Sequence, residues 1–175
     1  MRHNLVLEYG ITDHWMIDGR ATVLDERSNG FHFDTSPLET RYRFFDEGIL
    51  PVDIAASGEV NSRRDENGHQ IVGIEPRLIL SKNLGNLNLT FNFAVEFPFN
   101  RHSRSVEIRG GLEYDLTSFF HFGTELRYDI EEHAVAVIPQ IWFTFPHKVT
   151  LKSGYSYDFG VMHERFFRTA LVVEF

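Results

Sequence analysis

The sequence predicts an all-β fold, an antiparallel up-and-down transmembrane β-barrel, and three observations predict it. Apolar and polar residues alternate in segments of about ten residues along the whole 175-residue chain. A tilted membrane-spanning strand needs about 9–11 residues, whereas an average soluble strand has about five or six. There is no apolar run of the roughly 18 residues that mark a spanning helix, and no segment has a convincing helical period. The repeated unit is therefore a long strand with two different faces.

The segment Leu87–Phe97 is the clearest of these strands. Its odd positions hold Leu, Leu, Phe, Phe, Val and Phe, and its even positions hold Asn, Thr, Asn, Ala and Glu. A period of two places these sets on opposite faces of a strand. The same reading predicts about eleven strands, at residues 4–11, 14–25, 38–46, 51–61, 71–82, 87–98, 105–115, 119–130, 134–145, 149–159 and 166–175.

The connections between these strands alternate between tight and loose. Tight turns are expected at residues 12–13, 46–50, 83–86, 117–118 and 146–148, and looser connections at 27–37, 62–70, 100–104, 131–133 and 160–165. Bacterial barrels normally have an even number of strands. Because about eleven are visible, we expect a single barrel domain over residues 1–175 that lacks its signal peptide and first strand, with twelve strands in the intact protein.

Composition excludes several classes of protein. A net charge of −8 argues against nucleic acid as a partner. The absence of cysteine removes disulfides and thiolate metal sites. A mean hydropathy of −0.24 is too polar for a bundle of membrane helices, but a barrel tolerates it because half of each strand faces a wet lumen. No cofactor is expected.

The end of the chain carries a resemblance to known membrane proteins. Counting back from Phe175, every second residue is apolar or small, and no polar tail follows. This ending resembles the last strand of bacterial outer-membrane β-barrels, where the terminal aromatic residue is the signal that the barrel-assembly machinery reads. The resemblance implies an outer-membrane location, with membrane lipid and the assembly machinery as partners.

A turn motif extends the resemblance. The segment Leu7-Glu-Tyr-Gly-Ile-Thr-Asp13 is similar to the EYGLTD turn of a group of proteobacterial outer-membrane barrels, which includes proteins labelled as phenol-degradation (meta-pathway) components. Residues 111–117 repeat the turn, and residues 138–145 resemble the C-terminal half of the group. The resemblance implies the architecture and supplies no catalytic residues.

The inward face predicted by this register is crowded with charge. The lumen-lining candidates are Glu8, Arg20, Arg41, Arg43, Glu75, Arg77, Glu96, Arg109, Glu113, Glu125, Arg127, Lys152 and Arg168. Either these charges pair across strands and plug the barrel, or they line a polar passage. Because the whole predicted inward face has more acids than bases, an open passage is expected to favour cations. Trp15 is predicted to face outward and Trp142 inward.

Several histidines and one serine are candidates for metal binding or catalysis. One histidine falls in each looser connection, so loop closure could bring several together, with His69 and His133 as candidate metal ligands. Ordinary surface histidines are the simpler interpretation. Ser28-Asn29 is similar to part of the Ser-Asn signature of outer-membrane lipid hydrolases, but Glu26 stands where those enzymes need histidine.

These observations predict a passive channel or transport component for small molecules in a bacterial outer membrane. The alternatives are a structural surface barrel with a plugged lumen, a lipid-modifying barrel enzyme and a soluble ligand-binding barrel. The sequence does not identify a transported solute.

Overall fold

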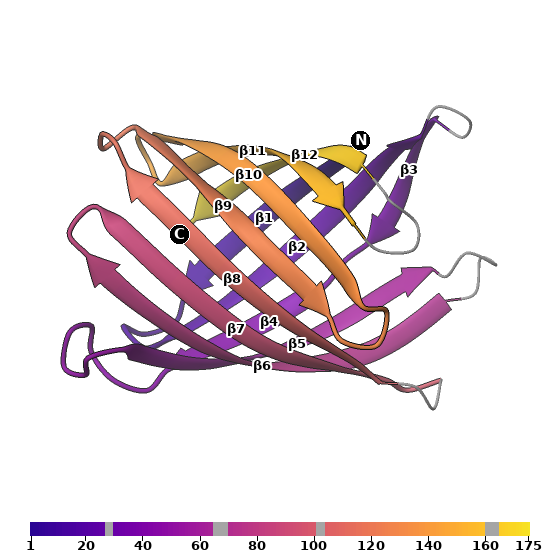
Figure 1. The fold of residues 1–175 in the computed structure, drawn as a ribbon, viewed down its shortest axis with the longest axis horizontal. Helices are drawn as coiled ribbons and strands as arrows, with labels where there is room; N and C mark the ends of the chain where they lie inside the picture. The colour runs from indigo at the N-terminus through magenta and orange to yellow at the C-terminus, as the bar shows by residue number, and fades with distance from the viewer. Residues whose placement is uncertain (27–29, 65–69, 101–103, 160–164) are drawn as a thin grey trace.

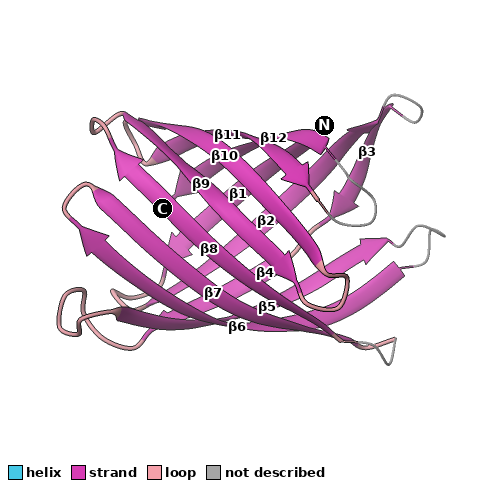
Figure 2. Cartoon of the chain, viewed as in Figure 1, coloured by secondary structure: helices cyan, strands magenta, loops and turns pink. Residues whose placement is uncertain are grey.

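All described elements are β-strands (Figures 1 and 2). A computed structural model describes residues 1–26, 30–64, 70–100, 104–159 and 165–175, and none of these lies in a helix. The strands are β1 (Arg2–Gly10), β2 (Trp15–Glu26), β3 (Gly30–Thr35), β4 (Leu38–Arg43), β5 (Asp53–Arg64), β6 (Gln70–Leu84), β7 (Leu87–Pro98), β8 (Ser105–Asp115), β9 (Phe120–Asp129), β10 (Ala134–Phe145), β11 (Val149–Asp158) and β12 (Arg165–Glu174). The predicted all-β fold is confirmed.

Eleven of these strands close into a barrel, and β3 is an additional strand beside it. Neighbours pair in chain order from β4 to β12, β2 pairs with β4, and β1 pairs with both β2 and β12. Among the described strands every neighbouring pair is antiparallel except β1–β12, which is parallel from Arg2 opposite Arg168 to Glu8 opposite Glu174. Consecutive strands of a meander reverse direction, so an odd number leaves the first and last strands pointing the same way. This parallel pairing of β1 with β12, called the seam below, corrects the expectation of a wholly antiparallel barrel.

The strand β3 falls in what the sequence predicted to be a loose connection. It pairs with the second half of β2, and β4 pairs with the first half. The strands β3 and β4 therefore lie end to end beside β2. Ser36 and Pro37 separate them, because proline has no N–H for the ladder. The carbonyl of Pro37 still accepts a hydrogen bond from Arg20 N at 3.0 Å. The prediction missed β3 because its short apolar–polar alternation lies between turn-forming residues.

The barrel has two open ends, which we call the C-terminal mouth and the N-terminal mouth after the chain terminus that lies at each (Figure 1). The C-terminal mouth holds Phe175 and the connections 11–14, 44–52, 85–86, 116–119 and 146–148. The N-terminal mouth holds Met1. Because β4 ends at Arg43 and β5 begins at Asp53, residues 44–52 form a wider connection than the tight turn expected at 46–50. Hydrogen bonds from Gly48 N to Asp53 Oδ1 and from Ile49 N to Asp46 O order it.

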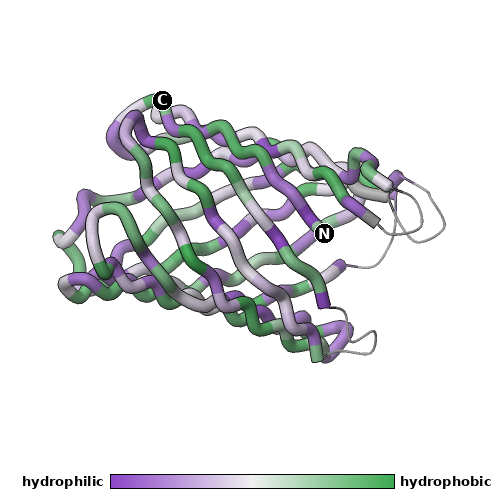
Figure 3. The backbone as a smooth tube through the Cα atoms, turned by 90° about the horizontal axis from the view of Figure 1, so that it is seen from above, coloured by the Kyte–Doolittle hydropathy of each residue, from purple (hydrophilic) through white to green (hydrophobic). Residues whose placement is uncertain are grey.

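Hydrophobic and hydrophilic residues alternate along the strands, as the colouring of the backbone in Figure 3 shows, and their side chains lie on opposite sides of the wall of the barrel. On β7, Leu89, Phe91, Phe93 and Phe97 are exposed on the outside, at 38–44% of their surface, while Ala94 between them is buried. The same apolar exterior continues around the barrel. The outward face of each strand is therefore the apolar one.

The interior is correspondingly polar. Among the described residues, the buried polar set is Asp18, Thr22, Glu39, Ser57, Glu59, Glu75 and Ser156, and it outnumbers the buried apolar set of Val6, Ile71, Ala94, Ile138, Trp142 and Val172. A soluble domain has the opposite arrangement, since Asp and Glu are rarely buried unless paired. The stability of this interior therefore depends on how its charges are paired.

Candidate functional site

Four of the cavities inside the barrel fall into two groups whose linings carry opposite net charge. Two cavities, of about 370 and 330 Å³, share the lining residues Arg41, Arg109, Gln140, Lys152 and Arg168. We call them the basic chamber. Two others, of about 460 and 170 Å³, share Glu107, Asp129 and Glu132. We call them the acidic chamber.

The two chambers occupy different halves of the barrel. The basic chamber reaches Asn88 at the start of β7 and Glu113 near the end of β8, so it extends toward the C-terminal mouth. The acidic chamber is lined by Arg2 at the start of β1 and by Glu132 in the β9–β10 turn, so it opens toward the N-terminal mouth. Arg20, Arg109 and Arg127 each line a cavity of both chambers and lie between them.

Most of the lumen-lining candidates lie inside the barrel. Glu8, Arg20, Arg41, Arg109, Glu113, Glu125, Arg127, Lys152 and Arg168 line the basic chamber, and Glu75 and Glu96 line the acidic one. Arg77 is buried in an ion-pair network between strands, with 8% of its side chain exposed. Arg43 lies apart from them, at the C-terminal mouth, where its Nη2 donates to the backbone oxygen of Asp13 at 2.8 Å.

A row of acids crosses half of the barrel wall. In cross-strand register, Glu174 faces Glu8, Glu8 faces Asp18, Asp18 faces Glu39, Glu39 faces Glu59, and Glu59 faces Glu75. Like charges directly opposite one another destabilise a sheet. This acid row therefore needs cations beside it, most of all at its buried members on β2, β4, β5 and β6.

Arg77 supplies much of that positive charge. Its guanidinium lies 3.2 Å from Glu39 Oε2, 2.5 Å from Glu75 Oε1 and 3.8 Å from Glu59 Oε2. Arg41 adds a contact of 3.1 Å to Glu39 Oε1. The planar guanidinium has several donors at fixed angles, which lets one side chain bridge three carboxylates where lysine provides only a point charge.

The network continues from β6 to β8. Arg109 lies 3.5 Å from Glu75 Oε1 and also pairs with Glu107 two residues away on its own strand. The chain Arg41–Glu39–Arg77–Glu75–Arg109–Glu107 therefore links β4, β6 and β8 across the lumen face. These contacts join residues far apart in sequence and tie the wall together from the inside.

A second network begins on the neighbouring strand β9 and reaches β10 and β12. Glu125 on β9 accepts from Arg127 Nε at 2.6 Å and from Arg168 Nη2 on β12 at 2.5 Å. Gln140 Nε2 on β10 donates to the same carboxylate at 3.1 Å. Two guanidinium groups thus share one acid, so this side of the basic chamber carries net positive charge.

Trp142 forms an apolar surface in the basic chamber. It is 7% exposed, and Lys152 Nζ lies 6.0 Å from the centroid of its ring. Gly123 on β9 makes room for the indole, since a Cβ at that position would stand 2.8 Å from Trp142 Cη2 and 2.0 Å from Leu112 O. Trp15, by contrast, is 44% exposed on the outside, and its Nε1 donates to Thr40 Oγ1 at 2.7 Å.

Three residues of the acid row and the networks were not predicted to face the lumen. Glu39, 1% exposed, and Glu59, 7% exposed, belong to the acid row, and Gln140 belongs to the second network. Glu39 carried a usable signal, since it stands two residues before Arg41 in a predicted strand and therefore faces the same way. The position of Gln140 next to Pro139 gave no comparable signal.

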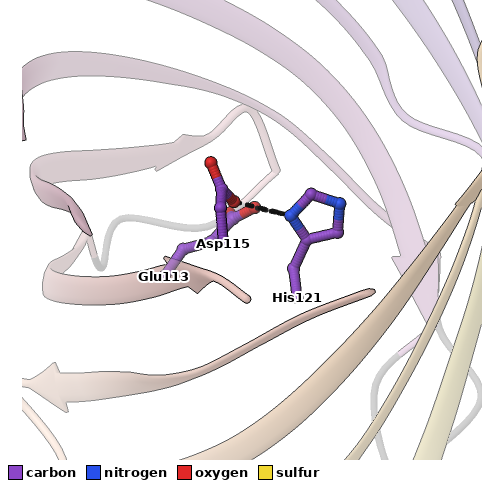
Figure 4. Close-up of side chains that lie close together, drawn as sticks. All are labelled: Glu113, Asp115 and His121. Carbon is purple, nitrogen blue, oxygen red and sulfur yellow. Dashed lines mark hydrogen bonds and ion pairs between the residues drawn. The ribbon is translucent and has the colours of Figure 1, made fainter. Parts of the chain in front are cut away.

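A separate polar cluster lies at the C-terminal mouth (Figure 4). His121 Nδ1 lies 2.6 Å from Asp115 Oδ1 and 3.9 Å from Glu113 Oε1, and ligand atoms of the three residues lie within 4.8 Å of one another. Imidazole and carboxylate groups suit divalent zinc or copper. A hydrogen-bonded His–Asp pair accounts for the same geometry, and the half-exposed Asp115 places it among surface pairs worth about 0–1 kcal/mol.

The loop residues considered as chemical sites are only partly described. His69 and Ser28 lie outside the described residues. His133 is described in the β9–β10 turn, where its Nδ1 lies 3.3 Å from Tyr128 Oη, and it is not part of the cluster at the C-terminal mouth. The prediction of a metal site at His69 and His133 therefore stays a prediction.

No protein-family model matches this chain, and no curated protein is similar enough to count as a relative. The resemblance to outer-membrane barrels, which rests on the chain's last strand and on the turn at Leu7–Asp13, therefore stays a prediction. Among the described residues, no helix has the length and apolar character needed to cross a membrane. What the geometry provides is a closed barrel with an apolar exterior and two charged chambers inside.

Proposed function

We propose that this chain is a β-barrel of a bacterial outer membrane and that small polar solutes pass through its lumen. The observation that most strongly supports this proposal is the inverted distribution of side chains, since Glu39 and Glu59 are buried while Phe91 and Phe93 are exposed. An apolar face of this extent is unfavourable in water. In a bilayer it faces hydrocarbon, and closure of the sheet leaves no unpaired edge there.

The cavities support a role for the lumen. The two chambers together reach from one half of the barrel to the other, and Arg109 lines both. A solute crossing the barrel would pass this side chain, whose contacts to Glu75 and Glu107 hold it in the lumen. The proposed role is a passive channel or transport component, with Arg109 on the path between its two chambers.

The ion-pair networks favour a second candidate function, a structural barrel with a closed lumen. Paired charges that bridge strands fill the interior and stabilise the wall. The test is conductance. The full chain, refolded in detergent and shown by heat-dependent gel migration to be a barrel, is added to a planar bilayer. Discrete current steps support the channel. A folded, inserted barrel without current supports the structural role, and a protein that stays monomeric in water without detergent contradicts both.

We also infer that Phe175 is the signal for the barrel-assembly machinery. It is 67% exposed at the C-terminal mouth, and its backbone N donates to Glu8 O at 2.9 Å, so the aromatic side chain is free to be recognised while the backbone is held. Deleting Phe175 is expected to lower the amount of barrel inserted in cells and to leave refolding in detergent possible. An unchanged cellular yield of inserted barrel contradicts the inference.

A further inference from the structure

We propose that the basic chamber binds a small organic carboxylate with a ring-sized apolar body. The proposal deepens the lumenal role proposed above and rests on it. Three properties of the described residues point to this ligand: an excess of cations, an indole ring fixed on the cavity wall, and a geometry that already holds a carboxylate.

The excess of cations is local. Arg20, Arg41, Arg109, Arg127, Lys152 and Arg168 line the chamber, against Glu8, Glu113 and Glu125. Glu125 is shared by two of the arginines. Among the described residues no carboxylate lies within ion-pair distance of Lys152, although Glu8 attracts it electrostatically. An anion placed between Lys152 and Arg168 would therefore balance charge that the protein itself leaves uncompensated.

The indole of Trp142 is the apolar surface of the chamber. Its Nε1 is buried, so a ligand in the chamber would contact the ring and not the N–H. A Cβ at Gly123 would stand 2.8 Å from Trp142 Cη2, so the ring packs closely against Gly123 and is fixed in place before any ligand arrives. The indole therefore offers a ligand a preformed apolar surface beside Lys152.

The geometry for a carboxylate is visible in the way Glu125 is held. Arg127, Arg168 and Gln140 surround its two oxygens at 2.5–3.1 Å, a fork that matches a planar carboxylate. The indole face adds apolar surface on the wall of the same cavity. With volumes of about 370 and 330 Å³, the chamber is at the lower end of the range for small-molecule sites, which suits a ligand the size of one ring.

The two tryptophans of the chain make binding measurable. In the Trp15→Phe variant, which alters an outward residue, all tryptophan fluorescence comes from Trp142. The refolded full chain is titrated with cyclohexanecarboxylate, which does not absorb at the excitation wavelength, and separately with cyclohexylammonium, which has the same body and the opposite charge. We expect a saturable change in fluorescence with the carboxylate only, weakened at 1 M salt because screening is strong there.

The variants locate the site. In the Trp15→Phe background, Lys152→Gln is expected to weaken binding about tenfold, since a charge-assisted contact is lost. Arg43→Gln is the matched control, because Arg43 contacts Asp13 O at the mouth and lines neither chamber. Lys152 makes no ion pair with the described carboxylates, so its replacement keeps the wall networks intact. Acetate is expected to bind more weakly than cyclohexanecarboxylate if the indole contributes.

Each outcome decides between the proposals. Equal binding of the ammonium compound, no saturable change, or equal weakening by Arg43→Gln overturns the carboxylate site. A current in planar bilayers that cyclohexanecarboxylate does not reduce leaves the channel standing and contradicts the site. Saturable binding by a barrel that carries no current leaves the site standing and contradicts the channel.

Discussion

The two chambers of the lumen are built from the same residue types and differ in how those residues are paired. In the acidic chamber, Glu59 and Glu75 belong to a row of carboxylates, and Arg77 lies among them. In the basic chamber, Arg127 and Arg168 compete for one carboxylate, and Lys152 has none within ion-pair distance among the described residues. Charge excess in a barrel of this kind is thus a property of each half of the lumen, which the net charge of −8 does not describe.

The cation preference expected from the acids and bases of the whole inward face stays a prediction. Acids predominate around the acidic chamber, although Arg2, Arg20 and Arg109 line it too. Bases predominate around the basic chamber, although Glu8, Glu113 and Glu125 line it too. We therefore expect a negative potential in the N-terminal half of the lumen and a positive one in the half toward the C-terminal mouth. A field of this kind is focused by low-dielectric walls.

The largest expected effect concerns the cation that holds the acid row together. Arg77→Met keeps the volume of the side chain and removes its charge, leaving Glu39, Glu59 and Glu75 with less compensation. We expect a loss of about 3–5 kcal/mol in the free energy of unfolding, typical of a buried pair that loses one partner. The measurement is urea unfolding in lipid vesicles.

The control for this variant is Arg43→Met at the mouth, where the change is expected to be within about 0.5 kcal/mol. A loss below about 1 kcal/mol for Arg77→Met would mean that water in the lumen screens the acid row. The acidic chamber would then need no fixed cation, and the contrast between the chambers would weaken.

A second prediction tests the facing on which both chambers depend. Phe93 on β7 is 41% exposed on the outside, and Asn92 beside it lines the basic chamber. Phe93→Arg is expected to cost about 2–4 kcal/mol of stability in a bilayer if it lies near the midplane. Asn92 lies opposite Arg109 on β8, so the new carboxylate of Asn92→Glu would face a cation, and this variant is expected to cost much less. Equal penalties for the two variants would contradict the register.

The smallest effect is electrical and applies if the lumen conducts. A lumen with opposite charge in its two halves is expected to pass unequal currents at equal positive and negative voltages. The inequality should shrink as salt rises, because the Debye length falls from about 10 Å at 0.1 M to about 3 Å at 1 M. Current–voltage curves of single oriented channels measure it. Symmetric curves at 0.1 M would show that one chamber alone controls the current.

The sequence predicted the wall of the barrel better than its interior. Alternation over Leu87–Phe97 was sufficient to predict β7 with its outward residues, because a period of two reports facing directly. The inward direction of Trp142 also followed from register, and the side chain is buried. The strand β3 was missed because Phe31 and Phe33 carry the alternation over too few residues between turn formers.

The pairing of charges could not be predicted from the sequence. Whether Arg77 contacts Glu39 depends on the register of three strands and on their tilt, and neither is encoded in the spacing of residues along one strand. The same limit applies to the seam, since the pairing of Glu8 with Glu174 requires knowing that the first and last strands meet in parallel.

The parallel seam has a consequence for how the protein can be oriented experimentally. Because an odd number of strands forms the ring, Met1 and Phe175 lie at opposite mouths (Figure 1). Short epitope tags joined to the two termini would therefore emerge on opposite sides of any bilayer that the barrel crosses. A protease added to sealed vesicles would remove one tag and spare the other. A single digestion would report both that the barrel spans the bilayer and which mouth faces outward.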